Sequence, residues 1–196
     1  MDKRKAIQIM TKAADLYREN LEDQKILFLY GVPSEVKKQI QTEENNISAI
    51  KGYEVAFHRY NFLHLTEEDF FFSKDGSTGQ KLEILESMMQ IKHNVTMIGD
   101  FAHRGTKLYS EKAAGNVCAC IGFVRDHNTK LNVPNTLLKK DIRDVTASPV
   151  QKVYAVISKE YAEEKYSVLE KIDKNLNLTV SYFSEQIERM LNRKSL

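Results

Sequence analysis

A histidine and a threonine stand two residues apart in the segment Asn61-Phe62-Leu63-His64-Leu65-Thr66. In an extended chain, alternate side chains point to opposite faces, so His64 and Thr66 would share one face and the two leucines the other. An imidazole titrates near pH 6.5 and can give or take a proton at neutral pH. The pattern therefore allows a proton-transfer site, although a single histidine in an apolar run is more often a structural residue.

Cationic side chains form a second group with possible chemistry. Lys139, Lys140 and Arg143 lie close together after Pro134 and fit either an anion-binding loop or a solvated turn. Because proline has no amide donor, the segment around Pro134 is expected at a sheet edge or in a bend. Lys81 is predicted in the first turn of a helix, where the helix dipole disfavours a cation, which hints at a functional role.

Alternating and helical patterns predict the elements that hold these residues. Apolar spacing predicts an amphipathic helix over 3–21, and the apolar run 26–30 predicts a central strand. A strand over 53–57 leads through His58 into the hexapeptide, after a loop or weak helix over 34–50. Further strands are predicted over 116–124, 150–159 and 176–182, and short strands or connectors over 97–101 and 106–109. Further helices are predicted over 79–91, over 163–172 and after Ser184.

Three adjacent aromatics, Phe70-Phe71-Phe72, fit either a hydrophobic core or a base-stacking platform, and the core is favoured because stacking needs exposed rings. Thr78 is expected to cap the helix that follows. Cys118 and Cys120 are predicted to be buried structural thiols, because no second cysteine pair is present to complete a zinc site.

The bulk composition is that of a globular protein. The 196 residues are 42% apolar and 29% charged, which predicts one soluble domain with a real core. No apolar run reaches the roughly 18 to 20 residues of a membrane span, and the N-terminus lacks a signal core, so an intracellular protein is expected. A net charge of +2 neither indicates nor excludes nucleic acid as a partner.

Three segments in order resemble a branch of phage and mobile-element nucleases of the barnase, EndoU, colicin and RelE-like type. They are Phe62-Leu63-His64-Leu65-Thr66, Lys81-Leu82-Glu83 and Pro134-Asn135-Thr136-Leu137-Leu138-Lys139-Lys140-Asp141-Ile142-Arg143, within a match over roughly Tyr53 to Lys159. The resemblance implies an α+β fold in a single domain, 1–196, with N-terminal helices packed on a curved, mostly antiparallel sheet. Glu67 replaces the glycine expected after Thr66, which predicts a different turn there.

The resemblance also implies metal-independent RNA cleavage on the concave face of the sheet, with no cofactor. In that reaction a base removes the proton of a 2′-hydroxyl, which attacks the neighbouring phosphate, and an acid protonates the departing oxygen. Asp141 would either orient His64 or pair with Arg143, and His58 is a candidate for the second proton-transfer group. The implied catalytic residues are His64, Thr66, Lys81, Asn135, Thr136, Asp141 and Arg143, and the implied substrate-binding residues are His58, Lys139 and Lys140.

Three functions remain open from the sequence. The first is an endoribonuclease in the cytoplasm of a bacterial host, a toxin or counter-defence factor that cleaves tRNA or CRISPR guide RNA. The second is an anti-CRISPR-type inhibitor that binds RNA or a host ribonucleoprotein such as a CRISPR effector without strong catalysis. The third is a metal-dependent nuclease with Asp100, His103 and Asp141 as ligands. No membrane partner is expected, and the sequence does not predict an oligomeric state.

Overall fold

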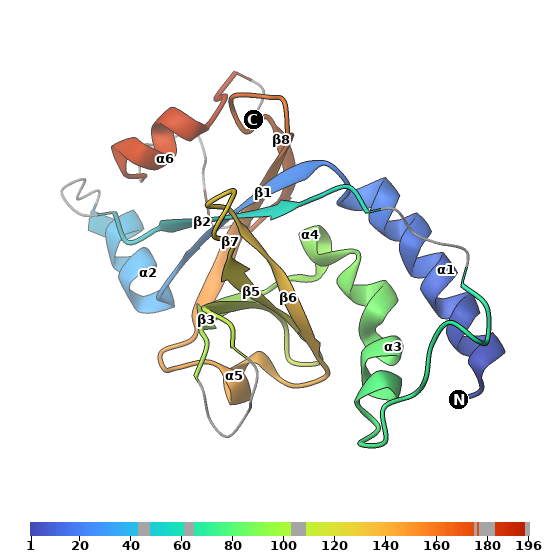
Figure 1. Ribbon diagram of the computed structural model, residues 1–196. Coiled ribbons are helices and arrows are strands. Elements are labelled where there is room, and N and C mark those ends of the chain that lie inside the picture. The colour runs from blue at the N-terminus through green and yellow to red at the C-terminus, as the bar shows by residue number, and fades with distance from the viewer. Residues whose placement is uncertain (43–47, 61–64, 103–108, 175, 177–182, 195–196) are drawn as a thin grey trace.

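A computed structural model describes residues 1–42, 48–60, 65–102, 109–174, 176 and 183–194 (Figure 1). Its helices are α1 (Lys3–Asn20), α2 (Pro33–Thr42), α3 (Ser77–Met88), α4 (Ile91–Asn94), α5 (Ile142–Val145) and α6 (Glu185–Met190). Its strands are β1 (Gln24–Gly31), β2 (Lys51–Phe57), β3 (Met97–Asp100), β4 (Lys112–Gly115), β5 (Cys120–Arg125), β6 (Asn132–Leu138), β7 (Gln151–Glu160) and β8 (Val168–Ile172).

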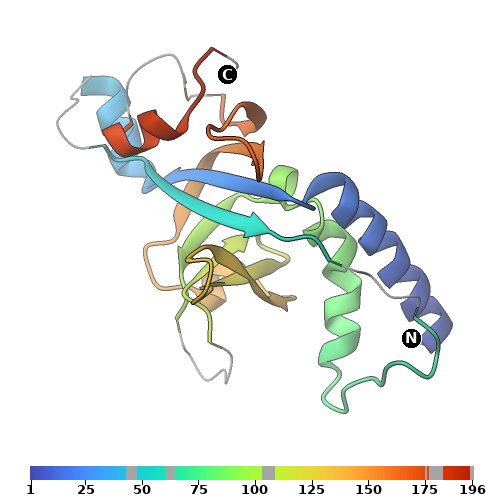
Figure 2. The ribbon, with the colours of Figure 1, turned by 45° about the horizontal axis from the view of Figure 1, so that its top comes forward.

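All the strands belong to one antiparallel sheet in the order β2-β1-β7-β3-β4-β5-β6, with β8 paired to β7. The sheet curls strongly, so that β2 and β6, at opposite ends of this order, approach each other (Figures 1 and 2). Asn132 Nδ2 on β6 donates a hydrogen bond of 2.7 Å to the carbonyl oxygen of Glu54 on β2. The curl gives the sheet a concave and a convex face.

The concave face holds the largest hydrophobic core. Aromatic and aliphatic side chains from the strands meet α1, α3 and α4 there, among them Phe28, Val55, Phe57, Ile98, Phe123, Tyr17, Ile84 and Ile91. The α1 helix is amphipathic as its spacing predicted, with Ala6, Ala13 and Tyr17 buried, and the Asp2 carboxylate caps its first turn by accepting from Lys5 N at 2.8 Å. The helices thus close one end of the curled sheet.

Two smaller cores cover the convex face. One joins α2 and α6 to β1 and β7 through residues such as Val36, Leu27, Ile157 and Ile187. The other packs Ile142 and Val145 of α5 against Phe101, Ala113 and Cys120 of the β3–β5 region. Side chains on the convex face are therefore committed mainly to packing, whereas the open end of the concave face is left to polar groups.

The predicted α+β class with an N-terminal helix on a curved antiparallel sheet is confirmed. The helix predicted over 163–172 is wrong, because β8 occupies this region and pairs along β7, with Ser158 opposite Val168. The short segment gains backbone hydrogen bonds from an open edge of β7, and this tertiary pairing overrides local helix propensity. The strand predicted over 116–124 begins only at Cys120, because Asn116 Oδ1 accepts from Cys118 N and Ala119 N in a turn.

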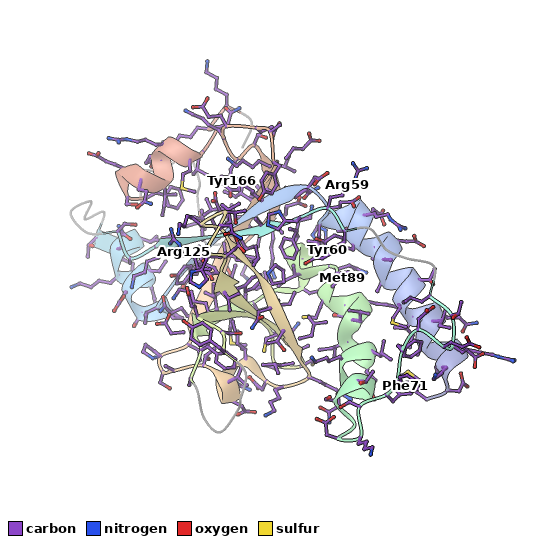
Figure 3. The ribbon with its side chains drawn as sticks, viewed as in Figure 1. Arg59, Tyr60, Phe71, Met89, Arg125 and Tyr166 are labelled. Carbon is purple, nitrogen blue, oxygen red and sulfur yellow. The ribbon has the colours of Figure 1, made fainter. Side chains whose placement is uncertain are left out.

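Three side chains differ from their predicted environments. Phe71 is 83% exposed, so its assignment to the core is wrong; it lies in the loop before α3 (Figure 3), with the Lys3 ammonium 4.7 Å from its ring centroid. Cys118 is exposed, and only Cys120 is buried. Thr78 does not cap α3, because the helix already begins at Ser77, and its hydroxyl accepts from Ser73 N at 2.9 Å. Most of the strand predicted over 176–182 and most of the segment 106–109 lie outside the described residues.

Candidate active site

His64 lies outside the described residues, but its neighbour Thr66 is placed in a turn before α3. Thr66 donates through its amide and hydroxyl to Asp69 Oδ2, at 2.5 and 2.9 Å, and its carbonyl oxygen accepts from Asp69 N. Glu67, which stands in place of the expected glycine, pairs with Arg4 at 3.0 Å and accepts through its carbonyl oxygen from Lys3. The turn therefore forms without glycine and is attached to the start of α1.

His58 lies at the end of β2, half-buried, and contacts a tyrosine. Its Nδ1 is 3.3 Å from the hydroxyl of Tyr161, whose ring also lies 4.8 Å from the Lys25 ammonium. The carbonyl oxygen of His58 accepts from the hydroxyl of Tyr17, at 2.6 Å, which ties β2 to α1. His58 therefore sits at the junction of β1, β2, β7 and α1.

The nominated lysines lie where α3 approaches the end of β6. Lys139 forms an ion pair with Glu83 on α3, and both side chains are about half exposed. Lys81 lies in the second turn of α3, not the first, and is exposed, as is Lys140. Residues two apart on a helix point in different directions, so Lys81 does not share the face on which Glu83 meets Lys139.

Asp141 and Arg143 pair with each other. The Arg143 guanidinium donates from Nε at 3.0 Å and from Nη2 at 2.5 Å to the Asp141 carboxylate, which also accepts from Arg143 N at 2.9 Å as the cap of α5. These hydrogen bonds hold the pKa of Asp141 below its ordinary value. Of the two roles open to Asp141, the structure shows the pairing with Arg143.

Asn135 and Thr136 lie on β6, where Asn135 is the extra residue of a β-bulge and Thr136 follows it. The exposed Asn135 donates from Nδ2 to the carbonyl oxygen of Tyr109 at 2.5 Å. Thr136 is buried opposite Gly122, and its hydroxyl has no hydrogen-bond partner among the described residues, as is also true of Ser110. Both hydroxyls lie beside Gly122, on the face shared with Cys120, which belongs to the convex core.

A polar cluster that these predictions missed lies at the open end of the concave face. Lys112 on β4 is directly opposite Asp100 on β3 and Phe123 on β5, and its ammonium forms an ion pair with the Asp100 carboxylate. The same ammonium lies 5.8 Å from the ring centroids of both Tyr30 on β1 and Tyr53 on β2. Four strands thus bring a carboxylate, an ammonium and two phenols together; we call this set the Lys112 cluster.

The Lys112 cluster runs from solvent into the core. The Asp100 side chain is 66% exposed and that of Lys112 is 21% exposed, whereas Tyr30 and Tyr53 are buried. Burial raises the pKa of both phenols, more for Tyr53, on which Glu111, Tyr30 and Asp100 act in the same direction; for Tyr30, Lys112 acts in the opposite direction. Both phenols therefore stay protonated at neutral pH and are able to donate a hydrogen bond.

Buried polar atoms accompany this cluster. The Tyr53 hydroxyl makes no hydrogen bond within the described part of the chain, and neither does the Oε1 atom of Gln151. Gln151 on β7 pairs with Ile98, which shares the concave face with Asp100 two residues further along β3. Buried polar groups usually have partners, so such atoms indicate a place for water or a ligand.

One sequence signal could have revealed the cluster. Lys112 is the first residue of a short strand of small residues, Lys112-Ala113-Ala114-Gly115. Taken alone, this sequence is typical of a loop, and only its pairing with the preceding strand identifies it as a strand. Pairing it with Met97–Asp100 would have placed the lysine opposite the aspartate. Tyr30 and Tyr53 give no local signal, because tyrosine in a buried strand is ordinary.

The residues proposed for a metal site are differently engaged. Asp100 pairs with Lys112, Asp141 pairs with Arg143, and His103 is not among the described residues. Across the described ranges, no group of three His, Cys, Asp or Glu side chains is placed to hold a metal ion.

An apolar groove of about 800 Å³ lies between α1 and α3, remote in sequence from the Lys112 cluster. Its lining includes Met10, Ala14, Leu85 and the labelled residues Tyr60 and Met89 (Figure 3).

None of the described helices is both long enough and apolar enough to span a membrane.

Comparison with known proteins gives one match. No curated protein and no solved structure matches the chain. A family model described as phage-Barnase-EndoU-ColicinE5/D-RelE like nuclease4 matches residues 65–175, which include α3 to α5 and β3 to β8 and therefore Asp100 and Lys112. The match begins directly after His64. The chain belongs to this family of phage-type, barnase-, EndoU-, colicin- and RelE-like nucleases.

Proposed function

We propose that the protein is a metal-independent endoribonuclease of phage or mobile-element origin that cleaves RNA by attack of a 2′-hydroxyl on the adjacent phosphate. Its family is one of nucleases, and the observation that carries the proposal is the Asp100–Lys112 ion pair on the concave face. A carboxylate beside an ammonium can accept a proton while the cation stabilises negative charge on a phosphoryl group.

The proposed reaction needs a base and an acid. The exposed Asp100 carboxylate takes the proton of the 2′-hydroxyl, and the 2′-oxygen forms a bond to phosphorus. The bond from phosphorus to the 5′-oxygen breaks, and protonated His64 gives its proton to that oxygen. The products are a 2′,3′-cyclic phosphate and a free 5′-hydroxyl.

Of the two proton-transfer groups, histidine suits the acid role because it is partly protonated near neutral pH. His58 is a weaker candidate for either role, since it contacts Tyr161 and no contact among the described residues connects it with the Lys112 cluster. We further propose that the substrate is tRNA or a CRISPR guide RNA in the bacterial cytoplasm, where the enzyme acts as a toxin or a counter-defence factor.

Cleavage assays in EDTA test the proposal. Purified wild type, His64→Ala and Asp100→Asn are incubated with total RNA, with tRNA and with guide RNA, and the new ends are analysed. Cleavage by wild type alone, with cyclic-phosphate ends, is expected. RNA that stays intact, or that is cleaved only after Mg²⁺ is added, would contradict the proposal. Intact RNA together with tight binding to a CRISPR nucleoprotein would instead support the inhibitor function.

A further inference from the structure

We propose that Lys112 and the hydroxyl of Tyr53 form the binding site for the scissile phosphate, both donating hydrogen bonds to its non-bridging oxygens. This inference rests on the proposed ribonuclease function and assigns catalytic residues to it. The site would take a phosphodiester monoanion, or inorganic phosphate as a smaller probe.

Lys112 is a cation prepared for an anionic ligand. Its side chain is mostly buried between the Tyr30 and Tyr53 rings, where a charge interacts more strongly than it does in water. Its described ionic partner, Asp100, is 66% exposed. A phosphate oxygen can bind the ammonium beside that carboxylate, because an ammonium has three hydrogen-bond donors.

Tyr53 supplies a donor that the fold leaves unused. The residue is 8% exposed, and its hydroxyl makes no hydrogen bond to any described group. A buried polar group without a partner loses its hydrogen bonds to water and gains none in return, so natural proteins seldom keep one without a reason. The Lys112 ammonium lies 5.8 Å from the centroid of the Tyr53 ring, which places this tyrosine at the polar end of the concave face.

The proposed arrangement also balances charge during the reaction. As Asp100 accepts the 2′-hydroxyl proton it becomes neutral, while the phosphoryl oxygens gain negative charge. Lys112 lies beside both positions, so a cation faces the negative charge before and after it moves. A fixed donor of this kind needs no rearrangement at the moment of reaction.

The other nominated cations lack these features. Lys139 is 44% exposed and Arg143 is 61% exposed, and each already pairs with a carboxylate that supports local structure: Glu83 connects β6 with α3, and Asp141 caps α5. A phosphate bound to either would disrupt a structural contact without gaining a desolvated cation. Their expected role is the attraction of RNA.

The test compares Lys112→Met, Lys112→Arg and Tyr53→Phe with two matched controls. Lys37→Met removes an exposed lysine from α2, and Tyr154→Phe removes the hydroxyl of a buried tyrosine in the convex core. Cleavage of saturating RNA in EDTA should fall about 10³-fold in Lys112→Met and about 10²-fold in Tyr53→Phe, with partial recovery in Lys112→Arg. Both controls should cleave at the wild-type rate.

A second measurement is independent of cleavage. Inorganic phosphate at low millimolar concentration should raise the melting temperature of wild type and of both controls, but not of Lys112→Met. In one outcome, the wild-type protein leaves RNA intact while phosphate still raises its melting temperature and not that of Lys112→Met. That result would refute the ribonuclease function and support the phosphate site. A phosphate response equal in Lys112→Met and wild type, or cleavage by folded Tyr53→Phe at the wild-type rate, would overturn the site. If Lys112→Met does not fold, the cleavage rates of Lys112→Arg and Tyr53→Phe still test the phosphate site.

Discussion

The side-chain amide of Asn132 donates a 2.7 Å hydrogen bond to the carbonyl oxygen of Glu54 and so joins β6 to β2, the two edge strands of the curled sheet. These strands are the two ends of the sheet order, and no backbone ladder connects them in the described structure. The hydrogen bond therefore helps to hold the concave face in the curvature that brings Tyr53 of β2 toward Lys112 of β4.

Loss of this hydrogen bond should weaken the fold slightly. Asn132→Ala is expected to lower the free energy of unfolding by about 1 kcal/mol, the usual net value of one hydrogen bond. Urea denaturation followed by circular dichroism measures the change. Asn128→Ala, in the exposed turn of the same hairpin, is the control and should have almost no effect. Equal stability of the two variants would show that the Asn132 contact does not hold the sheet ends together.

A buried ion pair between α4 and β8 should contribute far more. Lys92 Nζ donates to Glu170 Oε1 at 2.6 Å and to Gln24 Oε1 at 3.0 Å, and Ser158 donates to the same carboxylate oxygen at 2.6 Å. Removing one member of a buried pair leaves the other charge unpaired. Lys92→Met should therefore lower the free energy of unfolding by about 3 to 5 kcal/mol. Chemical denaturation of this variant beside Lys12→Met, whose exposed pair with Glu86 should matter little, tests the difference.

The same pair should make the protein sensitive to acid. Burial raises the pKa of Glu170, but the hydrogen bonds from Lys92 and Ser158 outweigh burial and place that pKa below its ordinary value of 4.5. A lowered folded-state pKa stabilises the protein above pH 4.5, and this contribution is lost as the pH falls through the folded-state value. Unfolding free energies between pH 6 and pH 3 should fall less steeply in Glu170→Gln than in wild type. Parallel curves would contradict this assignment.

The two cysteines should differ in reactivity. Burial raises the pKa of the Cys120 thiol to about 12, whereas Cys118 is exposed in the turn before β5. Iodoacetamide at pH 8 should label Cys118 alone in the native protein and both thiols after denaturation. Mass spectrometry of the labelled peptide, with Cys118→Ser and Cys120→Ser as references, measures the pattern. Rapid native labelling of Cys120 would show that the convex core opens readily.

Two glycine substitutions should act in opposite directions. A Cβ atom on Gly115 would lie 2.2 Å from the carbonyl oxygen of Ala119, so Gly115→Ala must move the backbone between β4 and β5 and should destabilise the protein by about 1 to 3 kcal/mol. Gly79 in α3 has open space around its Cβ position, so Gly79→Ala should stabilise by about 0.5 to 1 kcal/mol. Thermal unfolding of both variants checks the two signs.

Much of the fold could be predicted because it is encoded in local patterns. The regular apolar spacing of residues 3–21 predicted α1, and the apolar run around Phe28 predicted a central strand that lies between β2 and β7. Ser184 was expected to cap the last helix, and its hydroxyl accepts from Ile187 N at 3.5 Å. The segment at Val168–Ile172 was mispredicted because only its partner strand determines its conformation.

The site was harder to predict, because it is made by strand register and not by sequence spacing. Asp100 and Lys112 are twelve positions apart and meet only through the pairing of β3 with β4. The two tyrosines come from β1 and β2, which the curvature of the sheet brings close to Lys112. Local sequence emphasised Lys139, Asp141 and Arg143, which cluster because they are neighbours. Lys139 pairs with Glu83, and Arg143 pairs with Asp141. The contribution of His64 stays a prediction.

The most direct test of the ribonuclease proposal is end-group analysis of RNA incubated in EDTA with wild type, His64→Ala and Lys112→Met. We predict discrete fragments with 2′,3′-cyclic phosphate and 5′-hydroxyl ends from wild type, and intact RNA from the two variants when both are folded. Fragments with 5′-phosphate ends, or no cleavage by folded wild type of total RNA, tRNA or guide RNA, would contradict the account.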